Sequence, residues 1–220
     1  PSHFYTPQGM PVTIKFPDED DITADQFDYI KNYVTTFEKS LFSARGTQEG
    51  NYQQYFDLKS FVDYYLVNEI CGNPDMLWSM RMYKKSSGDP KIYVGPVWDF
   101  DLGFNNDGRI GKQDAQEKLM LNYAHDPRVW IEQIKQDPAF KQMVRSEWNK
   151  VKASLQTLPD YLDTENDLIK YSQIPNFKRW AVLGVNINQS WFTAQTHEAY
   201  VEFVRNYLVK RLAWLDGVIN

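Results

Sequence analysis

Cysteine and histidine are scarce in this sequence of 220 residues. The single cysteine, Cys71, excludes a disulfide within the chain, and the three histidines lie too far apart for the usual spacing of a zinc site. Cys71 stands in an apolar run with helical periodicity, which is typical of a small buried hydrophobic side chain.

Long apolar runs and an excess of positive charge are also absent. No stretch approaches the roughly 18 apolar residues that a membrane-spanning helix needs, so the sequence predicts no membrane span. Lys and Arg number 24 against 29 Asp and Glu, and this net charge of -5 argues against nucleic acid as the main partner. Hydrophobic residues make up 42% of the chain, which is ordinary for a globular protein.

Capped helices account for most of the remaining pattern. Thr23 and Gln26 have the spacing of a capping box before an apolar stripe that runs to about Phe42. Further helices are predicted from Asp57 to Gly72, from Asp137, from Pro159 to about Tyr171, and from Thr193 or Thr196 onward. Residues 80–83 and 91–94 flank a turn and predict a β hairpin, whereas 105–127 read as polar and irregular. The pattern predicts a mainly α (α+β) fold, a single domain over residues 1–220.

Aromatic residues reach 15% of the chain. One interpretation is core packing, and the stripe of the last helix (Val201, Val204, Leu208, Leu212 and Leu215) is expected to form a wall of that core. The alternative is a carbohydrate- or peptide-binding surface, because exposed Trp and Tyr suit such contacts.

Two carboxylates alternate with large apolar side chains directly after the predicted hairpin, in Trp98-Asp99-Phe100-Asp101. If the backbone is extended, Asp99 and Asp101 share one face, while Trp98 and Phe100 pack on the other and Trp98 is largely buried. Two like charges held close together repel, and a bound cation relieves that repulsion. The alternative is a strand end whose acids are solvated.

Asp75 is a second candidate, in a proline-containing turn just past a predicted helix. An acid there is often only a turn residue. However, a loop aspartate, a hairpin and then Asp99 24 residues later follow the order that protein kinases use for a catalytic-loop aspartate and a metal-binding aspartate. We therefore expect Asp75, Asp99 and Asp101 to line one open cleft, with carboxylates within about 10 Å of one another.

Four segments resemble a known family. They are Phe61 to Ile70 leading to Asn73-Pro74-Asp75, then Met82-Tyr83-Lys84-Lys85, then Gly95-Pro96-Val97-Trp98-Asp99-Phe100-Asp101-Leu102-Gly103-Phe104, and Arg211-Leu212-Ala213-Trp214-Leu215-Asp216. The family is that of spore coat protein H (CotH), atypical protein kinases, and Phe177-Lys178-Arg179-Trp180 is similar to a further stretch of it. The run around Trp98 and Asp99 is the most specific of these motifs.

The resemblance implies a helical domain like the C-lobe of a kinase, with Asp75 as the catalytic acid. It implies Asp99, together with Asp101, as the ligands of Mg²⁺ or Mn²⁺. It further implies ATP as the phosphate donor, a protein substrate whose hydroxyls accept the phosphate, and a secreted or cell-surface setting in the extracellular space or cell envelope of a bacterium.

Some positions depart from the kinase pattern. Five residues after a kinase catalytic aspartate a metal-binding Asn is expected, and here that position is Met80, with Ser79 beside it. Asp101 takes the place of the glycine in Asp-Phe-Gly. Either a nearby side chain takes the place of the missing Asn ligand, or the site is catalytically inactive. The candidate side chains are those of Asp101, Asn105, Asn106 and Asp107.

Residues 1–22 hold one lysine, Lys15, and no glycine-rich loop, although a complete kinase needs both a phosphate-binding lysine and such a loop. The resemblance therefore predicts that 1–220 is the C-terminal, lower-lobe-like part of the kinase-like domain, with its N-lobe upstream, and that this part alone is inactive. Two alternatives remain: a metal-dependent phosphohydrolase, and a non-catalytic bacterial cell-surface module. The second would bind through exposed aromatics such as Tyr123, Trp130, Trp180 and Trp191.

Overall fold

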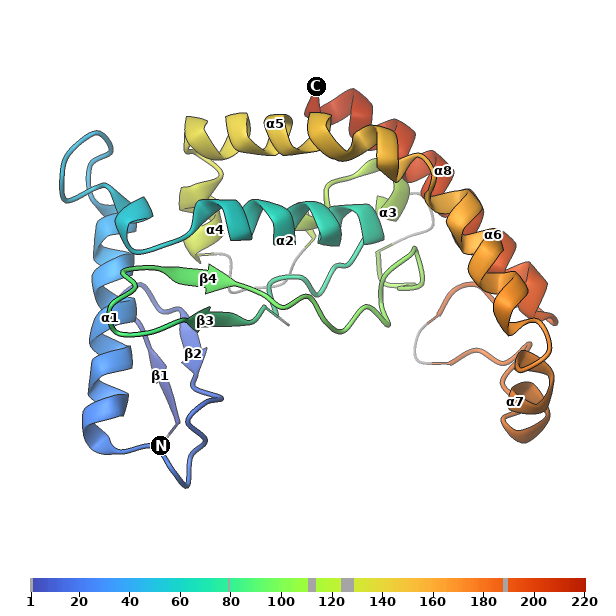
Figure 1. Ribbon diagram of the computed structural model, residues 1–220, viewed down its shortest axis with the longest axis horizontal. Helices are drawn as coiled ribbons and strands as arrows, with labels where there is room; N and C mark the ends of the chain where they lie inside the picture. The colour runs from blue at the N-terminus through green and yellow to red at the C-terminus, as the bar shows by residue number, and fades with distance from the viewer. Residues whose placement is uncertain (1, 79, 111–113, 124–128, 188–189) are drawn as a thin grey trace.

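The computed structural model describes residues 2–78, 80–110, 114–123, 129–187 and 190–220, and this part of the chain is mainly helical (Figure 1). Its eight α-helices are α1 (Ala24–Phe42), α2 (Leu58–Cys71), α3 (Asp114–Glu117), α4 (Val129–Ile134), α5 (Pro138–Leu155), α6 (Leu158–Ile169), α7 (Gln173–Arg179) and α8 (His197–Ile219). Two short 3-10 helices are η1 (Tyr52–Gln54) and η2 (Met120–Asn122). The predicted mainly helical fold is confirmed.

Two antiparallel hairpins complete the described part of the fold. One pairs β1 (His3–Tyr5) with β2 (Pro11–Thr13), and the other pairs β3 (Met82–Lys84) with β4 (Ile92–Val94). The register of the second places Met82 opposite Val94. This confirms the hairpin predicted between residues 80 and 94, with each strand one residue shorter than its predicted run.

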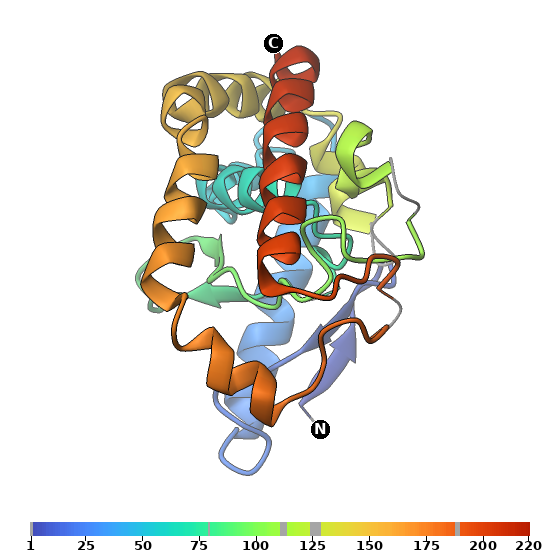
Figure 2. The same ribbon diagram turned by 90° about the vertical axis from the view of Figure 1, so that its right-hand side faces the viewer.

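Helix α2 lies at the centre of the molecule. It packs against α5, β4 and α8, and α6 runs beside α8 at the end of the molecule opposite α1 (Figures 1 and 2). Helix α1 contacts α4 at the other end, next to the β1–β2 hairpin. The C-terminal end of α2 therefore reaches the middle of the structure, where α8 and the chain after β4 meet it.

The predicted starts of α1, α2 and α5 are confirmed by their caps. The Thr23 hydroxyl accepts from Gln26 N at 3.3 Å while Gln26 Oε1 accepts from Thr23 N at 2.9 Å, which is a complete capping box. Asp57 accepts from Ser60 N at 2.8 Å to begin α2, and Asp137 accepts from the backbone to begin α5.

Aromatic rings form much of the core, as one of the two interpretations of the composition expected. Phe37 packs against Phe56 and Trp130 with ring centroids 5.0 Å apart in each pair. On α8, Leu208, Leu212 and Leu215 are buried as predicted, whereas Val201 and Val204 are only partly buried. None of the described helices is long and apolar enough to cross a membrane.

The prediction that 105–127 is irregular is confirmed for residues 105–110, which form turns, and is wrong at α3 and η2. Helix η2 is stabilised by a long-range contact. Met120 N and Leu121 N donate to the carboxylate of Glu69 on α2, at 2.8 and 3.0 Å, and both apolar side chains are buried. Residues 111–113 and 124–127 of this range lie outside the described part.

Candidate active site

The site begins where α2 ends. Gly72 adopts a left-handed conformation (φ 61°), and its N–H is satisfied by the carbonyls of Asn68 and Glu69. The chain then turns sharply, Asn73 is fully buried, and Asp75 follows on a partly exposed turn. Gly72 is suited to this position because residues with a Cβ rarely adopt this conformation.

The side chain of Asn73 joins the two candidate acidic segments. Its Nδ2 donates to Asn68 Oδ1 at 2.9 Å and to the carbonyl oxygen of Asp99 at 3.4 Å. Its Oδ1 accepts from Asp75 N at 3.1 Å. The backbones of Asp75 and Asp99 therefore meet at one buried carboxamide. The 10 Å separation of the carboxylates stays a prediction.

The extended backbone predicted for residues 98–101 is wrong. Strand β4 ends at Val94, Pro96 has no N–H to donate, and Asp99 itself is left-handed with φ 65°. Without a paired strand, nothing imposes the alternation of faces expected for Asp99 and Asp101.

The burial predicted for Trp98 is also wrong: its side chain is 42% exposed. The guanidinium carbon of Arg81 lies 4.3 Å from the centroid of the indole ring. Because the cation covers one face of the ring, Trp98 is stabilised at the surface by a cation–π contact and not by the core.

The loop after Asp101 is fastened to α2. Phe104 N donates to the carbonyl of Cys71 at 2.5 Å, and Asn106 Nδ2 donates to the carbonyl of Asp101 at 2.9 Å. Phe104 and Asn105 both have positive φ, 56° and 63°. A bulky residue in this conformation is uncommon and concentrates at functional sites, where the surrounding structure holds it.

Arg109 brings positive charge to the same region. Its guanidinium contacts the buried carboxylate of Asp107 through Nε to Oδ1 at 2.9 Å and Nη2 to Oδ2 at 2.6 Å. The hydrogen bonds to Asp107 raise the pKa of Arg109, and the negative charge of Asp75 adds to this rise. Arg109 is therefore within electrostatic range of the candidate catalytic acid.

Helix α8 holds the end of α2 in place. The last carbonyls of a helix have no partner within it, and here Arg211 Nε donates to Glu69 O at 2.8 Å and the Tyr207 hydroxyl donates to Ile70 O at 3.1 Å. Arg211 also pairs with the Glu69 carboxylate at 2.7 Å, and both side chains are fully buried. Burial raises the pKa of Glu69, and the charge of Arg211 opposes that rise.

A divalent cation would find two exposed carboxylates here, those of Asp99 and Asp101. Within the described ranges, no group of three or more His, Cys, Asp or Glu side chains is arranged to hold a metal ion. Mg²⁺ in nucleotide sites is commonly held by one or two carboxylates, with water and phosphate oxygens completing its shell. The donor set fits a nucleotide-bound ion and not an ion enclosed by protein.

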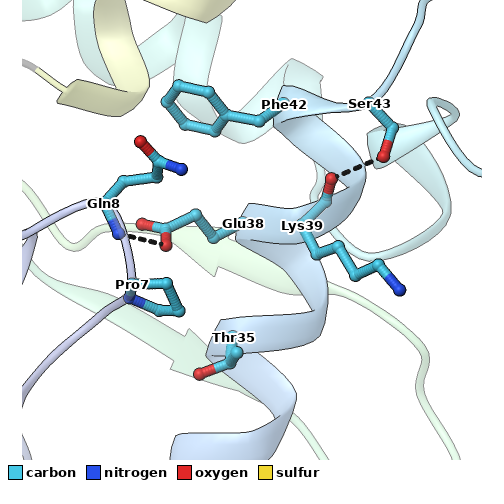
Figure 3. Close-up of a pocket in the computed structure, with 7 residues that line it drawn as sticks. All are labelled: Pro7, Gln8, Thr35, Glu38, Lys39, Phe42 and Ser43. Carbon is cyan, nitrogen blue, oxygen red and sulfur yellow. Dashed lines mark hydrogen bonds between the residues drawn. The ribbon is translucent and has the colours of Figure 1, made fainter.

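Two concave regions lie in different parts of the molecule. The first, of about 360 Å³, is bordered by Asp101 and Asn106 and otherwise by side chains between Phe177 and Tyr200. The second, of about 430 Å³, lies between the N-terminal segment and α1, with Glu38 at its base (Figure 3).

The carboxylate of Glu38, in the second concave region, already accepts three hydrogen bonds. It accepts from the Thr6 hydroxyl at 2.5 Å, Gln8 N at 2.9 Å and Trp130 Nε1 at 2.7 Å. The side chain is buried and ties the N-terminal hairpin to α1 and α4. We interpret this carboxylate as structural.

Several residues that build the site were given no role by the sequence. Asn73, Glu69 and Arg211 stand inside the segments that resemble the family, and Arg109 stands outside them. The sequence did contain a signal for Glu69 and Arg211. Each is a charged residue within the apolar stripe of a predicted helix, and their charges are opposite, which indicates a buried ion pair. Met80 stands at the position where a kinase has its metal-binding Asn and is partly buried, and Ser79 beside it lies outside the described part.

Comparison with known proteins supplies the family. A family model described as CotH kinase protein matches residues 8–215, nearly the whole chain. No curated protein matches. No solved structure matches either. The match covers α1, α2, the β3–β4 hairpin, the acidic loop and most of α8. The chain belongs to the CotH kinase protein family.

Proposed function

We propose that this chain is the acceptor- and metal-binding lobe of an ATP-dependent protein kinase. Membership of the CotH kinase family indicates an atypical kinase that uses ATP. The observation that carries the proposal further is the carboxamide of Asn73, which contacts the backbones of both Asp75 and Asp99. Phosphoryl transfer depends mainly on positioning and electrostatics, so a fixed relation between these two segments is what the reaction needs.

Asp75 is proposed to orient the hydroxyl of the protein substrate and to accept its proton as the phosphate bond forms. The residue is on a partly exposed turn whose backbone N–H donates to the buried side chain of Asn73, so the position of the turn is restrained. Arg109 lies within electrostatic range of Asp75, and its charge is balanced by the ion pair with Asp107.

Asp99 and Asp101 are proposed as the metal ligands, with the Asn106 amide next to them. Asp107 is less suited, because both of its carboxylate oxygens accept from Arg109. Asn105 is almost fully buried, which places its side chain away from an open cleft. When bound, Mg²⁺ or Mn²⁺ neutralises charge on the phosphates of ATP.

A non-catalytic surface module is the second candidate, because Trp180 is 58% exposed. Trp130, by contrast, is buried in the core and is excluded from a binding surface. Tyr123 and Trp191 are partly buried. An extracellular or cell-envelope setting belongs to either proposal and is tested by fractionation of the producing cells.

The test is transfer of radiolabelled γ-phosphate from ATP to protein, in the presence of Mg²⁺ or Mn²⁺, by the protein with its natural upstream segment. Replacing a catalytic base typically costs roughly 10²–10⁴-fold, so Asp75→Asn should lower the rate by that factor. Asp99→Asn should lower the rate as well, because it removes a proposed metal ligand. Asp28→Asn, an exposed acid on α1, is the matched control. Transfer that survives both site substitutions would overturn the proposal.

We expect the 220 residues alone to transfer no phosphate, because residues 1–22 hold one lysine and no glycine-rich loop. Labelling by this chain alone would show that the phosphate-binding groups lie elsewhere in it.

A further inference from the structure

The cavity beside Asp101 is lined mostly by apolar side chains. Apart from Asp101, Asn106 and Ser190, its walls come from Phe177, Val182, Leu183, Val185, Ile187 and Tyr200. Val185 and Ile187 are each 48% exposed. A volume of about 360 Å³ lies within the range of ligand pockets, roughly 300–1,000 Å³.

Further apolar side chains are exposed on α6 and α7 and in the residues that directly follow these helices. Leu168, Tyr171, Ile174 and Trp180 are all largely exposed. Four large exposed apolar side chains within 13 positions of the sequence are a feature of interaction surfaces. A ligand that contacts both the cavity and these side chains would be an extended chain and not a compact small molecule.

The same stretch has a distinct charge. Residues 168–197 contain no aspartate or glutamate, and they contain Lys170, Lys178 and Arg179, in a chain whose net charge is -5. Lys178 and Arg179 directly follow Phe177, a wall residue of the cavity, and both are exposed in the last turn of α7. The apolar surface is thus bordered by positive charge, which complements an acidic partner.

The apolar wall is attached to the proposed active site. Trp191 Nε1 donates to the carbonyl of Asn105 at 2.7 Å, and Ser190 forms an isolated antiparallel bridge with Asp107. Gly184 N, in turn, donates to the carbonyl of Ala194 at 2.7 Å. Any chain seated in the cavity is therefore held at a fixed distance from the loop that carries Asp101.

We propose that this cavity binds an apolar side chain of the protein substrate, close in sequence to the acceptor hydroxyl. The acceptor lies toward Asp101, the apolar residue fills the cavity, and acidic residues beyond it contact Lys178 and Arg179. This inference rests on the proposed kinase function and adds to it a substrate class, an extended segment that is both apolar and acidic.

The experiment measures binding without ATP, by fluorescence anisotropy. The probes are labelled Ala/Gly peptides with one serine, a leucine placed two to five residues away in successive peptides, and two glutamates beyond the leucine. One peptide of the set should bind, and replacing its leucine by alanine should weaken binding by about tenfold or more, as expected for lost contacts in an apolar pocket. Changing its glutamates to lysines should weaken binding as well.

Matched protein variants locate the site. Val185→Asp places a charge in the cavity and should weaken binding of the best peptide by about tenfold or more. Val218→Asp on α8 makes the same change at a side chain with nearly the same exposure, 49%, and should leave binding unchanged. Lys178→Glu should reduce the preference for glutamate over lysine in the peptide.

The outcomes separate this inference from the proposed function. In one outcome the peptide binds, its binding depends on Val185, and the protein with its upstream segment transfers no phosphate. That outcome would retain the docking surface and reject the kinase proposal. Phosphate transfer that depends on Asp75, with equal peptide binding in Val185→Asp and Val218→Asp, would reject the docking surface. Absence of peptide binding together with Val185-dependent association with anionic phospholipid vesicles would also reject it, in favour of a membrane surface.

Discussion

Replacing Asn73 by alanine tests the central geometric claim about the site. The side chain is fully buried, and its removal leaves Asn68 Oδ1 without the donor at 2.9 Å, which costs about 1–3 kcal/mol for a buried acceptor. The contacts with Asp75 N and Asp99 O lie nearer the surface or are longer, and together add about 1 kcal/mol. The expected loss of stability is therefore about 2–4 kcal/mol.

For a chain of this size, 1 kcal/mol corresponds to roughly 2–4 °C in Tm, so Asn73→Ala should melt about 4–16 °C lower. Differential scanning calorimetry measures this shift. Phosphate transfer, assayed well below both melting temperatures, should fall by about 10²-fold, because the two acidic segments lose their common support.

Asn68→Ala is the control for this experiment. It removes the same bond to Asn73, and also the bond from Asn68 Nδ2 to Tyr64 O at 2.8 Å, yet it leaves the contacts of Asn73 with Asp75 and Asp99. It should lose similar stability and keep most of the activity. Equal loss of activity in both variants would refute the positioning role of Asn73, and an unchanged Tm in Asn73→Ala would refute the contacts themselves.

Three further predictions concern the metal, the core and the thiol. Mg²⁺ or Mn²⁺ at ten times its Kd should add about 1.4 kcal/mol of stability, which corresponds to a Tm rise of roughly 3–6 °C. Asp99→Asn should abolish that rise without lowering the Tm of the metal-free protein. Equal rises in both proteins would show that the ion binds elsewhere. Leu215→Ala should lower the free energy of unfolding in urea by about 2–5 kcal/mol, because the Leu215 side chain is fully buried. Val218 is half exposed, so Val218→Ala should lower it by less than about 0.5 kcal/mol. Similar losses in both variants would contradict the orientation of α8. The side chain of Cys71 is partly buried, and this burial raises the pKa of its thiol to about 12. Iodoacetamide at pH 8 should therefore modify the folded chain much more slowly than the urea-unfolded chain, and similar rates would contradict the raised pKa.

The helices with local start signals could be predicted from the sequence. The Thr23 capping box, the Asp57 cap and the Asp137-Pro138 start are all built from residues within four positions of one another, so a short window contains their cause. Helix η2 could not be predicted in this way. Its backbone is held by Glu69, 51 residues earlier in the chain.

The candidate site, like the fold, could be predicted from the sequence only in part. The order of Asp75, the hairpin and Asp99 was visible in the sequence, and Asn73 contacts the backbones of both acids in the structure. The exposure of Trp98 and the left-handed conformation of Asp99 were not predicted, because the strand pattern was extended past Gly95 and Pro96, where strand pairing has already ended. The contact of Arg81 with Trp98 depends on the hairpin, and no spacing in the sequence indicates it.

The contacts of α8 with the end of α2 also bear on how the protein is made. Arg211 follows its partner Glu69 by 142 positions. At about 5–20 residues per second on the ribosome, that interval is roughly 7–28 s. During this time the carbonyls that end α2, and the buried Glu69 carboxylate, have no guanidinium to contact. The turn with Asn73 and Asp75 therefore gains its support late in synthesis, and we expect nascent chains that stop before α8 to be targets for chaperones and proteases.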